Sequence, residues 1–240
     1  MGMFCYQCQE TARGTGCEYG GVCGKSEELA DLQDLLIYTL KGISEIVVKG
    51  RLEMKLLSVV NYQVLKSLFM TITNANFDDE AILEQIKRMI AMRDDLRKHI
   101  SVDMLHDAAT FQVNSMQELT FKASYAGYNT KENEDIRSLR HLITFGIKGL
   151  AAYMHHALQL GKEKDELYAF VYEALSATID DGLSVDALVS LTLKTGQYGV
   201  MAMALLDEGN TGKYGNPEIT EVNIGVRNNP GILVSGHDLT

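Results

Sequence analysis

Proline and tryptophan are the residues that this sequence uses least. The 240-residue chain has 2 prolines and no tryptophan, together with 11 methionines. Because proline interrupts helices and methionine is well tolerated in them, this composition favours long helices over a sheet-rich fold. The chain is long enough to bury one large core or two modest ones.

Basic clusters and long apolar runs are missing as well. The chain has 22 Lys and Arg against 32 Asp and Glu, a formal net charge of −10, and no run of basic residues. Nucleic acid is therefore not an expected partner, since phosphate binding needs clustered cations. No stretch approaches the roughly eighteen apolar residues of a membrane helix, and the N-terminus does not have the pattern of a secretory signal. We expect a cytoplasmic protein without a membrane partner, in which clustered cysteines are metal ligands more often than disulfides.

Helical periodicity covers most of the chain after its first 26 residues. From Leu29 to Val48 the apolar residues recur at helical spacing. Further patterns of this kind cover 53–73, 79–99, 102–125, 133–160, 164–179 and 184–207. Ser26, Asp78 and Ser184 each stand before one of these patterns, where their side chains are predicted to cap the helix.

Parts of the helical region repeat. The matching segments are 35–43 with 142–150, at an offset of 107 residues, and 74–82 with 180–188, at an offset of 106. Two matches in the same order predict an internal duplication, with chance likeness between amphipathic helices as the alternative. Each unit would be a small antiparallel helix bundle. Both copies contain a Lys-Gly step, and we expect Gly42 and Gly149 to allow close helix approach, since glycine otherwise weakens a helix.

The character of the chain changes after Glu208. Residues 209–215 are glycine-rich and predict a turn, and an extended run covers 219–224. The continuous apolar run at 232–234 is typical of a buried parallel strand. Because a lone strand cannot bury both of its faces, we expect it to begin a further domain.

All four cysteines of the chain lie within nineteen residues near the N-terminus. They are Cys5, Cys8, Cys17 and Cys23, in the pattern C-x2-C-x8-C-x5-C. Four thiolates complete the ligand set of a cubane or binuclear iron–sulfur cluster, and also that of a structural zinc ion. The spacing leaves both open, whereas two disulfides do not suit a reducing compartment.

Short motifs accompany the cysteines. They are MFCYQCQET at 3–11, GC at 16–17, GVCGK at 21–25, LQDLLIY at 32–38 and GILVSGHDL at 231–239. These motifs closely resemble those of the hybrid-cluster (prismane) family of hydroxylamine reductases, in the same relative positions along the whole chain. The resemblance implies that the four cysteines bind a cluster that passes electrons onward. The eight residues between Cys8 and Cys17 resemble the anaerobe-type branch of the family, which implies a [4Fe–4S] cluster.

The resemblance also implies a fold. We expect an all-α chain of two tandem three-helix bundles with an N-terminal Cys-rich cluster loop, plus a C-terminal strand that would begin an α/β domain. The expected parts are a cluster loop at 1–26, a first helical bundle at 27–128, a second at 129–208, and a linker with the first strand of a missing α/β domain at 209–240.

In the family, a hybrid iron–sulfur–oxygen cluster lies between α/β domains. It reduces hydroxylamine to ammonia, or it reduces a related small nitrogen species such as nitric oxide. His237 matches a histidine ligand of that cluster. The other ligands would lie beyond Thr240, so we expect no catalytic residue in this chain and no turnover by it alone. The implied partners are a redox donor protein and the remaining α/β domains.

Two alternatives carry a different function. The first is a zinc-stapled helical module that serves protein interactions without redox activity, with the four cysteines holding one zinc ion. The second is a free-standing electron carrier. Metal analysis separates the zinc module from both cluster readings.

Overall fold

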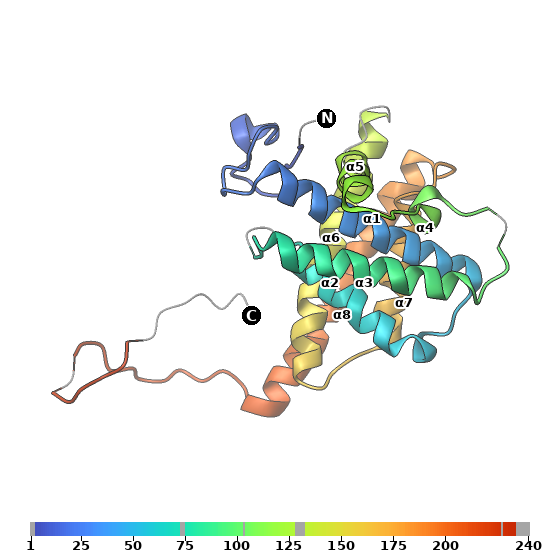
Figure 1. Cartoon of the computed structure of the whole chain (residues 1–240). Helices are drawn as coiled ribbons and strands as arrows, with labels where there is room; N and C mark the ends of the chain where they lie inside the picture. Colours follow the sequence, from blue (N-terminus) through green and yellow to red (C-terminus); the bar gives the residue numbers. More distant parts are fainter. Residues whose placement is uncertain (1–2, 73–74, 103, 128–132, 227, 234–240) are drawn as a thin grey trace.

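Long helices form the body of the protein, as the composition predicts. The computed structural model describes residues 3–72, 75–102, 104–127, 133–226 and 228–233. The α-helices are α1 (Glu27–Gly50), α2 (Ser58–Met70), α3 (Asp79–Arg97), α4 (Asp107–Thr110), α5 (Met116–Ala126), α6 (Glu134–Gln159), α7 (Asp165–Ala177) and α8 (Val185–Tyr214) (Figure 1). Two 3-10 turns are also present: η1 (Ala12–Gly14) lies in the loop before α1, and η2 (Met54–Leu56) lies between α1 and α2. Within the described ranges the one extended pairing is an isolated bridge, so the all-α class is confirmed.

The predicted capping residues begin their helices as expected. The Ser26 hydroxyl accepts a hydrogen bond from the Leu29 amide at 3.1 Å and begins α1. Asp78 and Ser184 cap α3 and α8 in the same way. Each such cap stabilises its helix by about 1 kcal/mol. Among the helices described, none is long and apolar enough to span a membrane.

The order and spacing of the helices show the same repeat as the sequence. Helices α1, α2 and α3 begin at residues 27, 58 and 79, and α6, α7 and α8 begin at 134, 165 and 185. These starts are 107, 107 and 106 residues apart, the offsets of the sequence match. Leu35 is the ninth residue of α1 and Leu142 the ninth of α6, so the matched segments occupy the same place in the two units.

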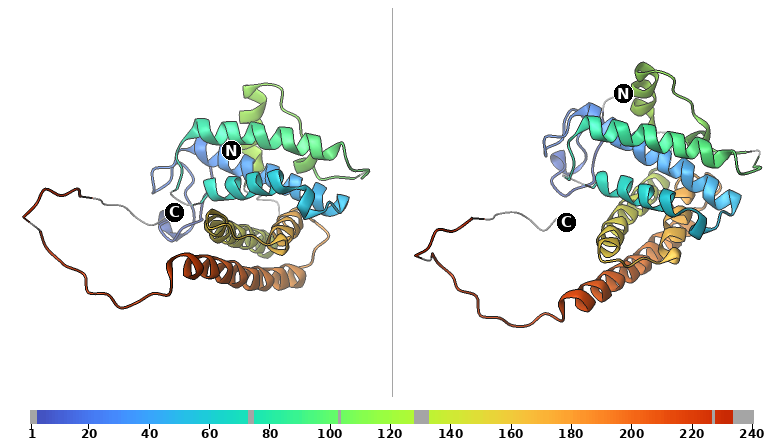
Figure 2. Two further views of the ribbon diagram at one scale, coloured as in Figure 1. Left: turned by 90° about the horizontal axis from the view of Figure 1, so that it is seen from below. Right: turned by 60° about the horizontal axis from the view of Figure 1, so that its bottom comes forward.

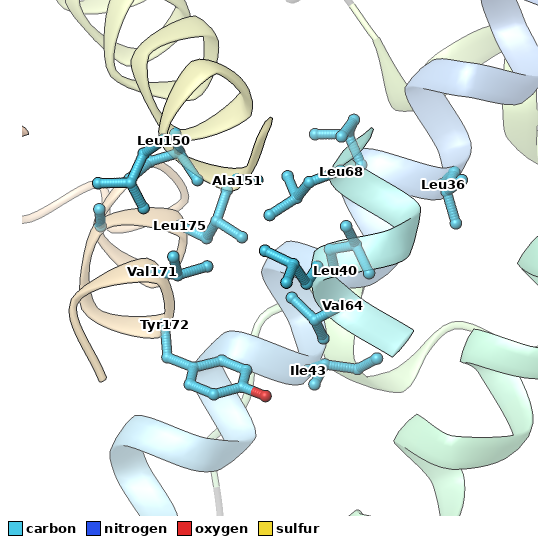
Figure 3. Close-up of a cluster of buried hydrophobic side chains, with 14 of the residues drawn as sticks. Leu36, Leu40, Ile43, Val64, Leu68, Leu150, Ala151, Val171, Tyr172 and Leu175 are labelled. Carbon is cyan, nitrogen blue, oxygen red and sulfur yellow. The ribbon is translucent and has the colours of Figure 1, made fainter. Parts of the chain in front are cut away.

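The two units pack against each other reciprocally. Within them, α1 packs on α3 and α6 packs on α8, whereas between them α1 contacts α7 and α6 contacts α2. The resulting core is continuous, and Figure 3 shows side chains from α1, α2, α6 and α7 meeting in it. At its edge the Tyr172 hydroxyl of α7 donates to the Asn61 amide oxygen of α2 at 2.8 Å. Each fully buried leucine or isoleucine contributes about 1.5–3 kcal/mol, so the shared core stabilises both units.

The two repeat-related glycines have different surroundings. A Cβ atom on Gly42 would lie 2.1 Å from the Ala108 carbonyl oxygen, so this glycine lets α1 and α4 meet backbone to backbone. Around Gly149 nothing in the described part of the chain lies within 4 Å of such an atom. The expected close approach is confirmed at Gly42 and wrong at Gly149. The reason is that the second unit has no described helix in the place of α4.

The helix expected over 102–125 is wrong, because α4 and α5 are separate. Phe111 has an extended backbone (φ −55°, ψ 145°), and Ser115 begins α5 by accepting from the Glu118 amide at 3.2 Å. The buried Arg93 guanidinium binds the carbonyl oxygens of Ala108 and Phe111 at 3.2 and 2.6 Å. These carbonyls are therefore satisfied by a side chain instead of by further helical amides.

The turn expected at 209–215 is also wrong, because α8 continues to Tyr214. Gly209 lies inside this helix and packs on Leu160, whose side chain would be 3.0 Å from a Cβ atom. The helix ends at Gly215, whose φ of +83° is unfavourable for residues with a side chain. Figure 2 shows α8 along one side of the molecule, with the following segment leading away from the helices.

The expected C-terminal strand is not present in the described residues. Residues 215–226 and 228–233 are irregular, and Ile224, Ile232 and Leu233 are almost fully exposed. A strand needs a neighbour for its backbone groups, and no described segment runs beside this one (Figure 1). The rest of the predicted strand, from Val234 on, lies outside the described residues, as does His237.

Candidate metal centre

The cysteine-rich loop before α1 is held by its own small core. Met3 and Cys17 are buried with Ala30 of α1, and Cys5 packs against this cluster. The backbones of Cys5 and Cys17 pair with each other through two hydrogen bonds of 3.0 and 2.8 Å. The first and third cysteines of the pattern are thereby fixed side by side, although eleven residues separate them.

The sulfur of Cys17 receives polar contacts although the residue is buried. The Ala12 amide donates to Cys17 Sγ at 3.4 Å, and the Thr11 hydroxyl lies 3.7 Å from it. Backbone N–H groups of Ala12 and Val22 lower the pKa of the Cys17 thiol, against the opposing effect of burial. This environment favours the thiolate, which is the form of cysteine that binds metals.

The other three cysteines lie closer to the surface. Cys5 and Cys8 are half-buried and Cys23 is exposed, and all four thiols are free of disulfides. A Cβ atom on Gly21 would lie 2.9 Å from Cys23 Sγ, so this position needs glycine to leave the sulfur room. Among the described residues, no three His, Cys, Asp or Glu side chains gather closely enough to hold one metal ion.

The donor set suits an iron–sulfur cluster. It offers four free thiols in one loop, with a backbone amide already directed at a sulfur. Thiolates are the usual ligands of such clusters, and N–H groups that point at sulfur adjust their potential. Cys5, Cys8, Cys17 and Cys23 are therefore the described residues that could hold it.

Behind the loop, α1 and α6 line a small polar cavity of about 60 Å³. Equivalent positions of the two repeats face each other across it: Asp34 with His141, Ile37 with Thr144, Tyr38 with Phe145, and Lys41 with Lys148. The segment Phe4–Gln7 covers this cavity. The duplication thus places two matching helix faces against the first cysteine of the loop.

A buried lysine connects this cavity with the loop. Lys148 is 5% exposed, and its ammonium donates to Gln7 Oε1 at 3.0 Å and to the Thr71 carbonyl at 3.2 Å. Burial lowers the pKa of Lys148 to about 8, although the nearby Asp34 carboxylate opposes this. Burial also raises the pKa of Asp34 to about 6, with Lys148 and then Lys25 acting against it.

Aromatic rings fill the space beside the cysteines. The Tyr6 ring stacks on His141 with centroids 5.2 Å apart, and it meets Phe145 edge-on at 5.6 Å. Burial, followed by the charge of Lys41, lowers the pKa of His141 to about 4, so its ring is neutral at pH 7. A neutral imidazole packs here as an aromatic plate and brings no further charge to the loop.

His106, His155 and His156 contact residues outside the cysteine loop. His155 stacks on Phe69 with centroids 4.5 Å apart, and the rings of His155 and His156 are 6.0 Å apart at 81°. Both histidines line a second groove between α2, α6 and α8, whose lining also includes Gln7 and Lys148. His106 accepts the Ala108 amide at 3.0 Å and caps α4. The His106 contact therefore serves to begin α4.

Sequence reasoning missed the buried charges Asp34 and Lys148. Both lie on helices with ordinary apolar spacing, where polar residues are expected to face water. A signal was nevertheless present, because the Lys-Gly step of the repeat contains Lys41 and Lys148. A lysine kept in both copies on one helix face marks a position with a common role.

Comparison with known proteins shows the family to which this chain belongs. Residues 3–240 match the Prismane/CO dehydrogenase family. The chain belongs to this family. Similar curated proteins are hydroxylamine reductases from Acetivibrio thermocellus, Parabacteroides distasonis and Clostridium perfringens, with 62%, 51% and 50% identity.

The alignments with these relatives cover nearly the whole of this chain but less than half of each relative. The alignments include 100%, 99% and 100% of this chain but 44%, 44% and 45% of these hydroxylamine reductases. The chain therefore spans less than half the length of the curated relatives that it matches. Membership of the prismane family implies iron–sulfur clusters.

Proposed function

We propose that this chain is the electron-transfer portion of a cytoplasmic hydroxylamine reductase. The observation that carries the proposal is the prismane match over residues 3–240 together with four free thiols in one loop. Cys5, Cys8, Cys17 and Cys23 would hold a [4Fe–4S] cluster, because the eight residues between Cys8 and Cys17 resemble the anaerobe-type branch of the family. When bound, this cluster supplies one-electron transfer.

The loop residues prepare the site in distinct ways. The Ala12 amide donates to the Cys17 sulfur and favours its thiolate, and the bridge between Cys5 and Cys17 fixes the spacing of their backbones. Gly21 leaves room beside Cys23. The Tyr6 ring and its stacking partner His141 exclude water from the inner side of the loop.

The chemistry on nitrogen belongs to a larger protein in this proposal. Its hybrid iron–sulfur–oxygen cluster, with His237 as one ligand, would reduce hydroxylamine to ammonia. A related small nitrogen species such as nitric oxide is the alternative substrate. The curated relatives, which are about twice as long as this chain, are named hydroxylamine reductases. A redox donor protein would supply electrons to the cysteine loop, and the α/β domains would receive them.

Anaerobic purification followed by metal analysis tests the proposal. The protein should be brown and contain about four irons and four sulfides per chain, as expected for a cubane on four thiolates. Cys8→Ser should lose the colour and keep its helical circular dichroism, because the helices have their own core. Glu18→Gln changes an exposed residue of the same loop and should keep the full iron content.

The zinc module predicts the opposite result. A colourless protein with one zinc ion per chain would contradict the electron-transfer proposal and favour an interaction module. Equal iron content in the wild type and in Cys8→Ser would also contradict the proposal, because it would show that Cys8 does not hold the cluster.

A further inference from the structure

The ammonium of Lys148 occupies a special place, because it is buried directly behind the cysteine loop. It reaches from α6 to Gln7, which lies between Cys5 and Cys8 in the sequence. Its second acceptor is the carbonyl oxygen of Thr71, at the end of α2. The lysine therefore joins both repeat units to the loop, although burying its charge costs desolvation free energy.

The contact fixes the orientation of the Gln7 side chain. A lysine ammonium can donate hydrogen bonds but not accept them, so Gln7 Oε1 must face Lys148. The Gln7 amide nitrogen then faces the opposite way, and it lies 4.0 Å from Cys5 Sγ. Lys148 thus directs an N–H group toward the sulfur of the first cysteine without touching that sulfur itself.

The charges around Lys148 leave a local positive excess. The groups that act on it are Asp34, Lys25, Cys5 and Lys41. Of these, Lys25 and Lys41 add positive charge, and Asp34 opposes it. Lys25 is itself buried, with its ammonium 2.6 Å from Gln33 Oε1. A chain with a net charge of −10 therefore gathers three lysines around Asp34 behind its cysteines, with Asp31 as a second carboxylate that acts on Asp34.

We infer that Lys148 is a positioning and charge-compensating residue for the cluster, which raises the reduction potential of that cluster. The inference rests on the proposed function, since it needs a cluster on the four cysteines. On reduction, one electron passes from a one-electron donor to the cluster, and no bond forms or breaks. The added negative charge is stabilised by a buried cation, because charges interact more strongly away from water.

The test is a potentiometric titration of the full, cluster-containing chain at pH 7, with redox dyes and absorbance as the readout. Lys148 is protonated and Asp34 ionised at this pH, given pKa values of about 8 and about 6. Lys148→Met should shift the redox equilibrium at least tenfold toward the oxidised form, about 59 mV for one electron. Lys148→Arg keeps the charge and should restore most of the shift.

Two further variants make the sign of the effect testable. Asp34→Asn removes the opposing charge, so the potential should rise when it is measured at a pH low enough to keep Lys148 protonated without this carboxylate. Lys55→Met removes an ammonium from a side chain that is 74% exposed, and the potential should stay unchanged because water screens such charges. Iron content and circular dichroism are measured for every variant, so that only folded, fully loaded protein is compared.

Several results would overturn the inference. An unchanged potential in loaded Lys148→Met would show that the ammonium does not act on the cluster. Equal effects of Lys148→Arg and Lys148→Met would show that the charge is irrelevant. If Lys148→Met does not fold, Asp34→Asn decides alone, and an unchanged or lower potential rejects the role of charge. Wild-type protein without iron is a different outcome, which contradicts the proposed function itself.

Discussion

Asp34 and His141 are both the eighth residue of their helices, α1 and α6, and both line the cavity behind Tyr6. The duplication has thus brought two copies of one position face to face, and they now carry different side chains. Burial acts on the two groups in opposite directions, since it raises the pKa of Asp34 to about 6 and lowers that of His141 to about 4. Each group is thereby driven toward its neutral form.

The pKa of His141 predicts a pH-dependent stability. In the unfolded chain a histidine titrates near pH 6.5, whereas folded His141 titrates near pH 4. Between these values the unfolded state binds more protons, so the contribution of His141 to the free energy of unfolding rises with pH. His141→Phe should lose this contribution, which is at most about 3 kcal/mol.

Urea unfolding at about pH 4.5 and pH 6.5 measures this difference. The wild type should gain more stability than His141→Phe between the two values. His99 is exposed, so His99→Phe should behave as the wild type. Parallel curves for His141→Phe and the wild type would show that His141 is not held neutral in the fold.

The repeat-related glycines offer a matched pair of substitutions. Gly42→Ala would place a methyl group 2.1 Å from the Ala108 carbonyl oxygen, so it should lower the free energy of unfolding by about 1–3 kcal/mol. Gly149→Ala meets nothing within 4 Å and should raise it by up to about 1 kcal/mol, because alanine is the better helix former. Thermal and urea unfolding measure both; effects of the same sign would contradict this account of the two sites.

Removing the buried guanidinium of Arg93 should be strongly destabilising. Arg93→Met leaves the carbonyl oxygens of Ala108 and Phe111 without their donor, and we expect a loss of about 3 kcal/mol or more. Arg88 lies on the same helix but is exposed, so Arg88→Met should change the free energy of unfolding by about 0.5 kcal/mol or less. Comparable losses in the two variants would place the stabilisation elsewhere.

This chain should not reduce hydroxylamine, even with its cluster intact. All four cysteines lie in the N-terminal loop, so no thiol remains for a second cluster. Reduced dye should still transfer electrons to the loaded chain, since the proposed site is complete. The measurement compares hydroxylamine consumption by the wild type with that by Cys8→Ser. Turnover clearly above this control would move the chemistry into the helical part.

Local patterns in the sequence were sufficient for much of the fold. Ser26 caps α1 through an amide only three residues away, so this cap can be predicted from the local sequence. The apolar face of α1 can likewise be predicted from spacing alone, without knowing which helix packs on it. The break before Phe111 could not be predicted in this way, because Arg93 on another helix takes up the carbonyl oxygens there. The continuation of α8 through Gly209 depends similarly on this glycine fitting against Leu160.

The candidate site divides in the same manner. The spacing of the cysteines is local and predicted the metal-binding loop. The contact between Lys148 and Gln7 joins residues 141 positions apart, and no periodic pattern contains such information. The structure alone brings Lys148 to the loop, although the repeated Lys-Gly step marked its position.

The long reach of Lys148 also orders events at the ribosome. The cysteine loop is synthesised before α6, and the lysine that contacts Gln7 is made 141 residues after it. At about 5–20 residues per second, the loop waits for roughly 7–28 seconds before α6 can close behind it. During this interval the four thiols stay open to the delivery of iron and sulfide, so loading can precede closure in the nascent chain.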